Sequence, residues 1–152
     1  GPLIDQYAQL GDPLKFKFAE PQIQELNFSF SGLKTSVLYF LQKQTPEFVL
    51  ENRNDLCASI QYTIVQILLK KLVKAVNQTN VKHVCIAGGV SANSGLRNGL
   101  VALGQKKGWQ VYIPDFSYCT DNAAMIAITG YHKYLNSQFV PLSVNPSARA
   151  EW

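Results

Sequence analysis

The chain has 152 residues, of which 47% are hydrophobic and 16% are charged, and this balance predicts one globular domain with a single core. Its net charge of +4 is compatible with an anionic partner without requiring one. No apolar run reaches ~18 residues and no signal-peptide pattern opens the chain, so the sequence indicates neither a membrane span nor a cleaved leader.

The first elements are expected to be a short helix followed by extended chain. Residues 2–10 have a helical pattern with a proline in the first turn, and the sequence GDP at 11–13 ends it. Phenylalanines then alternate along the chain, as is typical of two short strands or of extended loops. They are Phe16 and Phe18, then Phe28 and Phe30.

Two helices are predicted next. Apolar residues recur with helical spacing from Gly32 until the sequence QTPE at 44–47. A second helix spans roughly 51–77 and carries a broad apolar stripe. At about 1.5 Å per residue it is about 40 Å long, which is enough to cross a whole sheet.

The second half of the chain alternates between strands and helices. The predicted order is a strand at 82–88, a helix at 91–108, a strand at 109–114 and a helix at 121–138. This order predicts parallel strands joined by right-handed crossovers, and therefore an α/β fold. The tail at 140–152 is rich in Pro, Ser and Asn and is expected to be irregular.

A glycine turn at the end of the first of these strands is a candidate ligand site. Gly88 and Gly89 lie at the edge where open α/β sheets bind ligands, and they let a flat or anionic group approach the main chain. Ser91 is the expected N-cap of the next helix, whose first amides face the same space. Asn93 and Arg97 then share one helix face. The pattern is equally compatible with a tight turn beside ordinary surface residues.

Two acidic residues have a similar ambiguity. Asp121 precedes a helix of small residues, where a carboxylate stabilises the helix dipole by about 0.3–1 kcal/mol. Alternatively, it points into the same cleft as Gly88 and ligates a divalent metal or orients a phosphate. Asp5, on the first turn of the first helix, either caps that helix or accepts hydrogen bonds from a ribose diol.

The cysteines and histidines exclude several classes of site. Cys57, Cys85 and Cys119 are far apart and lie in or beside apolar stretches, which predicts reduced thiols and a cytoplasmic protein. His83 and His132 are not spaced for a zinc pair. No hydrolytic triad pattern is visible, so a hydrolytic triad is not predicted.

The chain resembles the tRNA threonylcarbamoyladenosine transferase family in four segments, which occur in the family's order and at its separations. The segments are GPLID at 1–5, FSFSGLKTSV at 28–37, IAGGVSANSGLR at 86–97 and YCTDNAAMIA at 118–127. The resemblance implies an actin, Hsp70 and sugar-kinase-like (RNase H-like) fold of two α/β lobes. Residues 1–152 correspond to the second, carboxyl-terminal lobe, and the amino-terminal lobe is absent.

The same resemblance implies a substrate site. Gly88 and Gly89 form the adenosine-side turn, and Asn93 contacts the nucleotide part of threonylcarbamoyl-AMP. Gly1 and Asp5 also contact this substrate. The implied reaction moves the threonylcarbamoyl group to the adenosine 3′ of the anticodon in tRNAs that read codons beginning with A.

A metal ion is implied as well. Asp121 matches the family's carboxylate ligand of one divalent metal, iron or zinc. The family's two metal-binding histidines lie in an H-x-x-x-H segment of the first lobe, which this sequence lacks. Because a metal held by one carboxylate is weakly bound, the chain alone is expected to have little or no transferase activity. The resemblance implies that catalysis by the complete protein rests on positioning and charge stabilisation, with no residue of this chain acting as a covalent nucleophile.

The partners implied by the resemblance are tRNA, a paralogous TsaB-type subunit and a P-loop ATPase of the TsaE type. Two copies of the isolated lobe are also expected to associate through the exposed face of the cleft. Two other functions stay open at this point. The chain is compatible with the nucleotide-binding lobe of a kinase or ATPase of the same superfamily, and with a non-enzymatic module that binds partner proteins.

Overall fold

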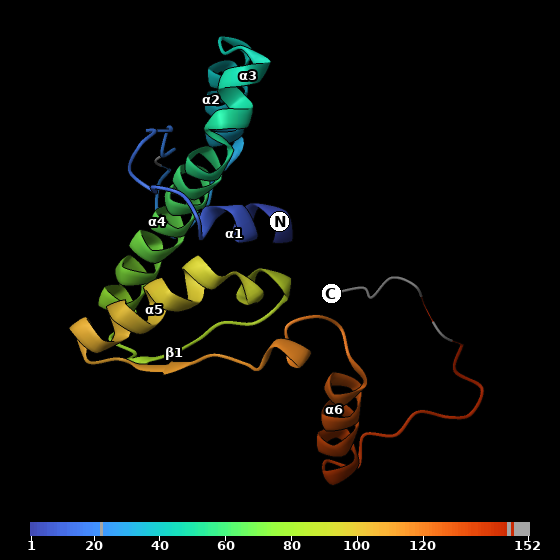
Figure 1. Ribbon diagram of the computed structural model, residues 1–152. Coiled ribbons are helices and arrows are strands. Elements are labelled where there is room, and N and C mark those ends of the chain that lie inside the picture. The colour runs from blue at the N-terminus through green and yellow to red at the C-terminus, as the bar shows by residue number, and fades with distance from the viewer. Residues whose placement is uncertain (22, 146, 148–152) are drawn as a thin grey trace.

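The computed structural model describes residues 1–21, 23–145 and 147. Helices dominate it, and the short strands lie along one side of the body (Figure 1). The elements are α1 (Pro2–Ala8), α2 (Ser31–Gln42), α3 (Pro46–Glu51), α4 (Arg53–Thr79), β1 (His83–Cys85), η1 (Gly89–Ala92), α5 (Ser94–Lys107), β2 (Gln110–Tyr112), η2 (Phe116–Tyr118) and α6 (Ala123–Leu135), where η marks a 3₁₀ turn.

The structure is mostly helical, and its small parallel sheet of two strands is compatible with the predicted α/β class. β1 and β2 are parallel, with Val84 opposite Val111, and α5 connects them. The Phe16 to Phe30 region contains no strand among its described residues and runs as extended loops, the second of the two predicted forms. Thr45 begins the additional helix α3 by accepting a hydrogen bond from the Phe48 N–H at 3.2 Å.

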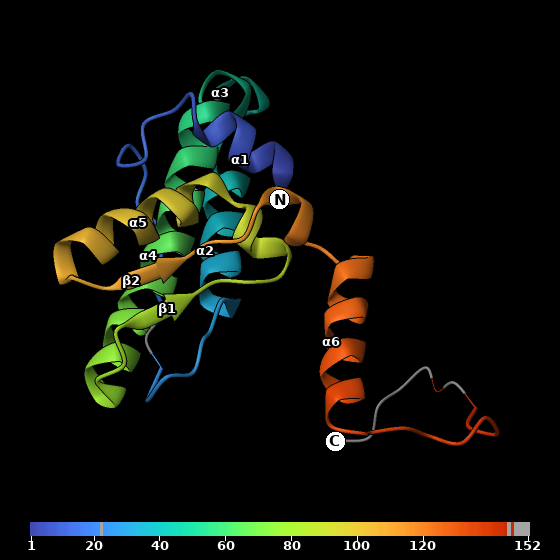
Figure 2. The same cartoon turned by 90° about the horizontal axis from the view of Figure 1, so that it is seen from below.

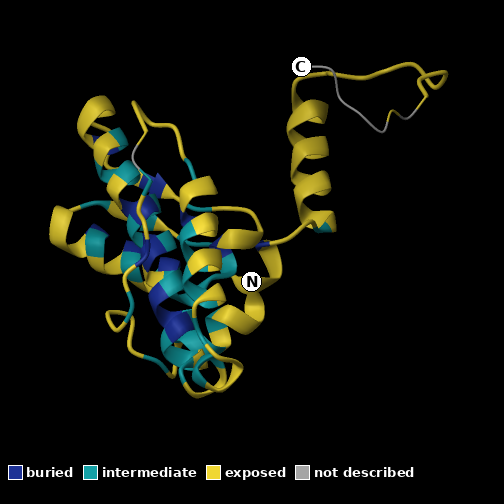
Figure 3. Cartoon of the chain, turned by 90° about the horizontal axis from the view of Figure 1, so that it is seen from above, coloured by how far each residue is buried: buried dark blue, intermediate teal, exposed yellow. Residues whose placement is uncertain are grey.

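Helix α4 is the centre of the hydrophobic core. It is 27 residues long, close to the predicted span, and its buried side chains reach in two directions. Toward the sheet, Val65 and Leu69 pack with Leu100 of α5 and with Val84. On the other side, α4 packs with the loop and α2 through a cluster of Phe18, Leu33, Leu56 and Ile67. Figure 3 shows buried residues concentrated along this helix.

Among the described residues, α4 is also the one helix that is long and apolar enough to cross a membrane. Its most apolar window has a mean hydropathy of 1.3, and 39% of that window is buried. These values are weak support for a membrane span, because the core helix of a soluble protein also reaches them. In this structure α4 packs against α1, α3 and α5, as a core helix does.

Helix α5 lies close to β2 because Gly104 has no side chain. A Cβ at this position would lie 2.4 Å from the Val111 Cγ2 atom. The carbonyl of Gly104 accepts a hydrogen bond from the Trp109 N–H at 2.9 Å, and Gly108 ends the helix with a φ of +68°. The short turn into β2 therefore depends on small residues at the end of α5.

The two terminal helices are placed very differently. Helix α1 lies across α4 and beside the start of α5, whereas α6 projects away from the body (Figure 2). All residues of α6 are exposed, including large apolar ones such as Ile126 and Tyr134. The predicted irregular tail agrees with the structure through residue 145 and at 147, and the rest of it lies outside the described residues.

The close approach at Gly104 generates a stability prediction. Gly104→Ala forces the new methyl group into Val111, so the free energy of unfolding should fall by about 1–3 kcal/mol. Gly130→Ala in α6 is the matched control, since a Cβ there meets nothing within 4 Å. It should change stability little or raise it by up to about 1 kcal/mol. Urea unfolding of both variants measures this, and equal losses would contradict the packing described.

Candidate functional site

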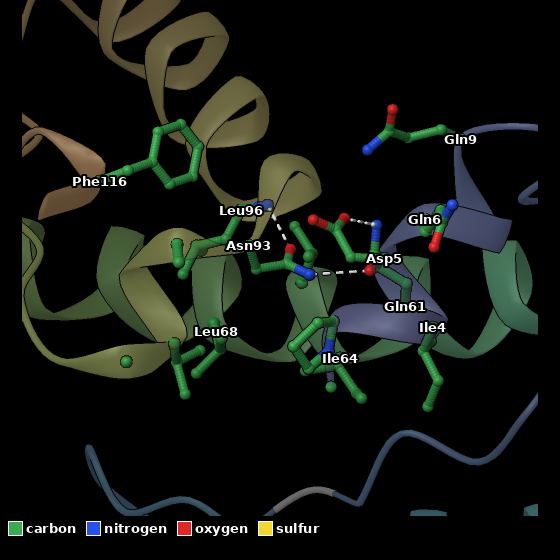
Figure 4. A pocket seen from close by; sticks show the side chains of 16 residues that line it. Ile4, Asp5, Gln6, Gln9, Gln61, Ile64, Leu68, Asn93, Leu96 and Phe116 are labelled. Atoms are coloured by element: carbon green, nitrogen blue, oxygen red, sulfur yellow. Dashed lines mark hydrogen bonds between the residues drawn. The ribbon is translucent and has the colours of Figure 1, made fainter. Parts of the chain in front are cut away.

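A pocket of about 710 Å³ lies where α1, α4, η1 and the start of α5 meet. Its walls are mainly apolar, with contributions from Ile4, Ile64 and Leu68. Polar groups from Asp5, Gln61 and Asn93 project toward one another at one end of it (Figure 4). An apolar cavity with a few convergent polar groups is the usual form of a small-molecule site.

Most of the residues predicted to bind substrate are brought together here. Gly1, Asp5, Gly89 and Asn93 all line the pocket. Gly88 lies next to it but does not line it, and its φ of +79° is a conformation that glycine adopts most readily. A Cβ on either glycine would meet no atom within 4 Å. Neighbouring atoms therefore leave the main chain at 88–89 unobstructed, and its contact with a ligand stays a prediction.

Asp5 joins α1 to the start of α5. Its Oδ2 accepts a hydrogen bond from the Ser94 N–H at 3.0 Å, and its Oδ1 accepts from the Ser94 hydroxyl at 2.6 Å. Burial raises the pKa of this carboxyl, but hydrogen bonds from Ser94 and Gln61 outweigh burial and leave the pKa below its ordinary value of 3.8. Asp5 is therefore a carboxylate at neutral pH.

Gln61 is a site residue that the sequence analysis missed. It donates from Nε2 to Asp5 Oδ1 at 2.9 Å and accepts at Oε1 from Asn93 Nδ2 at 2.7 Å. Asn93 in turn accepts the Leu96 N–H at 2.9 Å. The available signal was a polar amide inside the apolar stripe of the long helix, and such residues are often surface residues at the edge of a stripe.

The expected N-cap of α5 was wrong by two residues. Asn93, not Ser91, caps the helix, because residues 89–92 form the 3₁₀ turn η1 before the helix starts. Ser91 is buried, and its hydroxyl donates to the Gly88 carbonyl at 2.7 Å. The side chain of Ser91 therefore closes the glycine turn instead of starting the helix.

Arg97 does not line the pocket but holds its wall. Its guanidinium donates to the carbonyls of Ser91 at 2.7 Å and Pro114 at 2.6 Å. It also lies over the ring of Phe116, 4.1 Å from the centroid, and Phe116 does line the pocket. Arg97 thus connects η1 to the loop after β2, whereas Asn93, which was expected to share its helix face, lines the pocket.

The structure does not bring Asp121 into this pocket. Asp121 is exposed, and the neighbouring Asn122 caps α6 by accepting the Met125 N–H at 3.2 Å. Within the described residues, no group of three or more His, Cys, Asp or Glu side chains could hold a metal ion. The metal role of Asp121 therefore stays a prediction.

Comparison with known proteins gives close relatives. The chain is 59% identical to the tRNA N6-adenosine threonylcarbamoyltransferase of Christiangramia forsetii, and the match covers 98% of the chain and 45% of that protein. The proteins of the same name from Riemerella anatipestifer and Thermotoga neapolitana are 51% and 42% identical over 99% and 95% of the chain. These matches cover 45% and 44% of the relatives' own lengths.

The chain thus spans slightly less than half the length of the curated relatives it matches. A family model described as "TsaD: tRNA N6-adenosine threonylcarbamoyltransferase" matches residues 1–128, which include every residue that lines the pocket. The chain therefore belongs to the TsaD family of tRNA N6-adenosine threonylcarbamoyltransferases.

Proposed function

We propose that this chain supplies one half of the substrate site of a threonylcarbamoyltransferase. The complete protein would move the threonylcarbamoyl group from threonylcarbamoyl-AMP to the adenosine 3′ of the anticodon in tRNAs that read codons beginning with A. The observation that carries the proposal is the meeting of Gly1, Asp5, Gly89 and Asn93 at one pocket. The names of the relatives support the same activity.

The pocket offers suitable groups for the AMP part of this substrate. Apolar side chains such as Ile64 and Leu68 provide a surface for a flat base. The charged Asp5 can accept hydrogen bonds from ribose hydroxyls, which are stronger than bonds between neutral groups. The open main chain at Gly89 leaves room for a phosphate or a base edge.

In the proposed reaction, the chain's own residues bind and orient the nucleotide. The adenosine N6 amine of the tRNA attacks the carbamoyl carbon, the bond from this carbon to the phosphate oxygen breaks, and AMP leaves while the amine loses a proton. No side chain of this pocket forms a covalent bond in that step. The main contribution of Asp5, Gly89 and Asn93 is then to position threonylcarbamoyl-AMP for this attack.

The fold and the metal belong to the same proposal. We place the chain as the second lobe of an actin, Hsp70 and sugar-kinase-like (RNase H-like) protein, and its coverage of 45% of its relatives supports a lobe of that size. Asp121 would be one ligand of a divalent iron or zinc ion, which supplies Lewis-acid chemistry when bound. One carboxylate does not complete such a site, so the chain alone should have little or no transferase activity.

The proposed partners are tRNA, a paralogous TsaB-type subunit and a P-loop ATPase of the TsaE type, as the family resemblance implies. We also propose a cytoplasmic location. The three cysteines, Cys57, Cys85 and Cys119, are unpaired thiols, which suits a reducing compartment.

Nucleotide binding by this chain tests the proposal. The chain should bind AMP in isothermal titration calorimetry, and Asp5→Asn should weaken this binding at least about tenfold because a charged acceptor is lost. Asp12→Asn is the matched control. Asp12 does not line the pocket, and its Oδ1 accepts the Leu14 N–H at 2.8 Å, a bond that an asparagine can also accept. The control should bind AMP like the wild type.

Two results would contradict the proposal. One is a folded wild-type chain that does not bind AMP at all. The other is an Asp5→Asn variant that is folded and binds AMP as tightly as the Asp12→Asn control. Circular dichroism of each variant establishes that it is folded before the titration.

Association of two isolated chains through the exposed pocket face is a further part of the proposal. Val90 and Phe116 line the pocket and are 64% and 66% exposed. Sedimentation equilibrium at high concentration should show a dimer, and Val90→Glu should shift it to monomer by adding a charge. Val81→Glu, at an exposed position outside the pocket, should leave the dimer unchanged. A wild-type monomer at all concentrations would refute the association.

A further inference from the structure

We infer that Gln61 is a positioning residue of this pocket, which fixes the orientation of the Asn93 amide by a chain of hydrogen bonds from the Asp5 carboxylate. The effect on ligand binding rests on the proposed function. The chain of hydrogen bonds itself does not, so the two can be tested separately.

Starting from the Asp5 carboxylate, the row of hydrogen bonds fixes the orientation of each amide in turn. A carboxylate can only accept hydrogen bonds, so Gln61 must turn its NH₂ group toward Asp5. The Gln61 carbonyl oxygen then faces Asn93, which must present its own NH₂ group at 2.7 Å. The Asn93 carbonyl oxygen is left on the opposite side of the amide.

The Leu96 N–H, at the other end of this row of hydrogen bonds, independently fixes the same orientation. The Leu96 backbone N–H can only donate, and it needs an acceptor because it lies in the first turn of α5, where no helical carbonyl is available. The Asn93 carbonyl oxygen accepts it at 2.9 Å. The two ends impose the same directions on both amides, so each hydrogen bond of this row pairs one donor with one acceptor.

Gly95 provides the space that this arrangement needs. A Cβ at Gly95 would lie 3.0 Å from the Gln61 Nε2 atom and 3.3 Å from the Asn93 Oδ1 atom. Both distances are tighter than ordinary contacts, so a side chain here would push the two amides out of line. The glycine in the sequence ANSGLR is explained by the side chains of Gln61 and Asn93, since its own backbone is helical.

This chain of hydrogen bonds makes Asn93 a donor toward the ligand. Its carbonyl oxygen is turned to the start of α5, and one N–H is used by Gln61. The second N–H makes no hydrogen bond to the part of the chain that the structure describes, and Asn93 lines the pocket. The ligand atom that it recognises should therefore be an acceptor, such as a purine ring nitrogen or a ribose or phosphate oxygen.

Replacing the Gln61 amide by a carboxylate tests this inference. Gln61→Glu places two carboxylates against each other, so the thermal midpoint should fall, the Asn93 side-chain NH₂ signals should shift in ¹H–¹⁵N NMR spectra, and AMP binding should weaken about tenfold. Gln66→Glu is the matched control, because Gln66 lies on the same helix outside the pocket. It should leave all three measurements close to those of the wild type.

The double variant Asp5→Asn/Gln61→Glu separates hydrogen-bond direction from packing. The new carboxylate at position 61 can accept from an amide on each side, so the thermal midpoint and the Asn93 signals should return toward the wild type. AMP binding should stay weak, since the carboxylate at position 5 is lost. The inference would be overturned if the double variant were less stable than Gln61→Glu alone. It would also be overturned if Gln61→Glu gave the same three measurements as the Gln66→Glu control. Recovery of the Asn93 signals in a chain that never binds AMP would support the inference and contradict the proposed function.

Discussion

The hydrogen bonds between Asp5 and Ser94 hold the two sides of the candidate site together. They join residues 89 positions apart in the sequence and fix α1 against the first turn of α5. Because the acceptor is ionised, these bonds are roughly twice as strong as bonds between neutral groups. Helix α1 has no buried residue, and it also packs against α4. The bonds from Ser94 to Asp5 thus fix one end of the pocket, where α1 meets the start of α5.

The opposite wall of the pocket depends on Arg97. Its bonds to the Ser91 and Pro114 carbonyls fix η1 and the loop after β2 relative to α5, and its stacking on Phe116 places an aromatic ring at the pocket rim. The arginine thus satisfies backbone groups that would otherwise be left at the ends of short elements. Asn93 lies between the two walls and, through Gln61, is connected to both α4 and Asp5.

The sequence was sufficient for features that depend on local pattern. The long helix, the parallel strands and the open turn at Gly88 and Gly89 follow from apolar spacing and from missing side chains, and the structure contains all three. Features that depend on contacts between distant segments could not be predicted. Gln61 gains its role only because folding brings α4 beside Asn93. Ser91 does not cap α5 as predicted, because its hydroxyl donates to the Gly88 carbonyl within the preceding turn. Asp121 lies just before α6, and no local pattern reveals that this helix projects away from the body.

The central claim is that a nucleotide occupies the pocket between α1, α4 and the start of α5, and chemical-shift mapping with AMP tests it most directly. In ¹H–¹⁵N spectra of the chain, saturable shifts should concentrate at Asp5, Gln61, Gly89 and Asn93, with smaller effects beyond the pocket. Saturable shifts confined to α6, or to Leu72 and Ala75 in the second apolar pocket, would contradict the account.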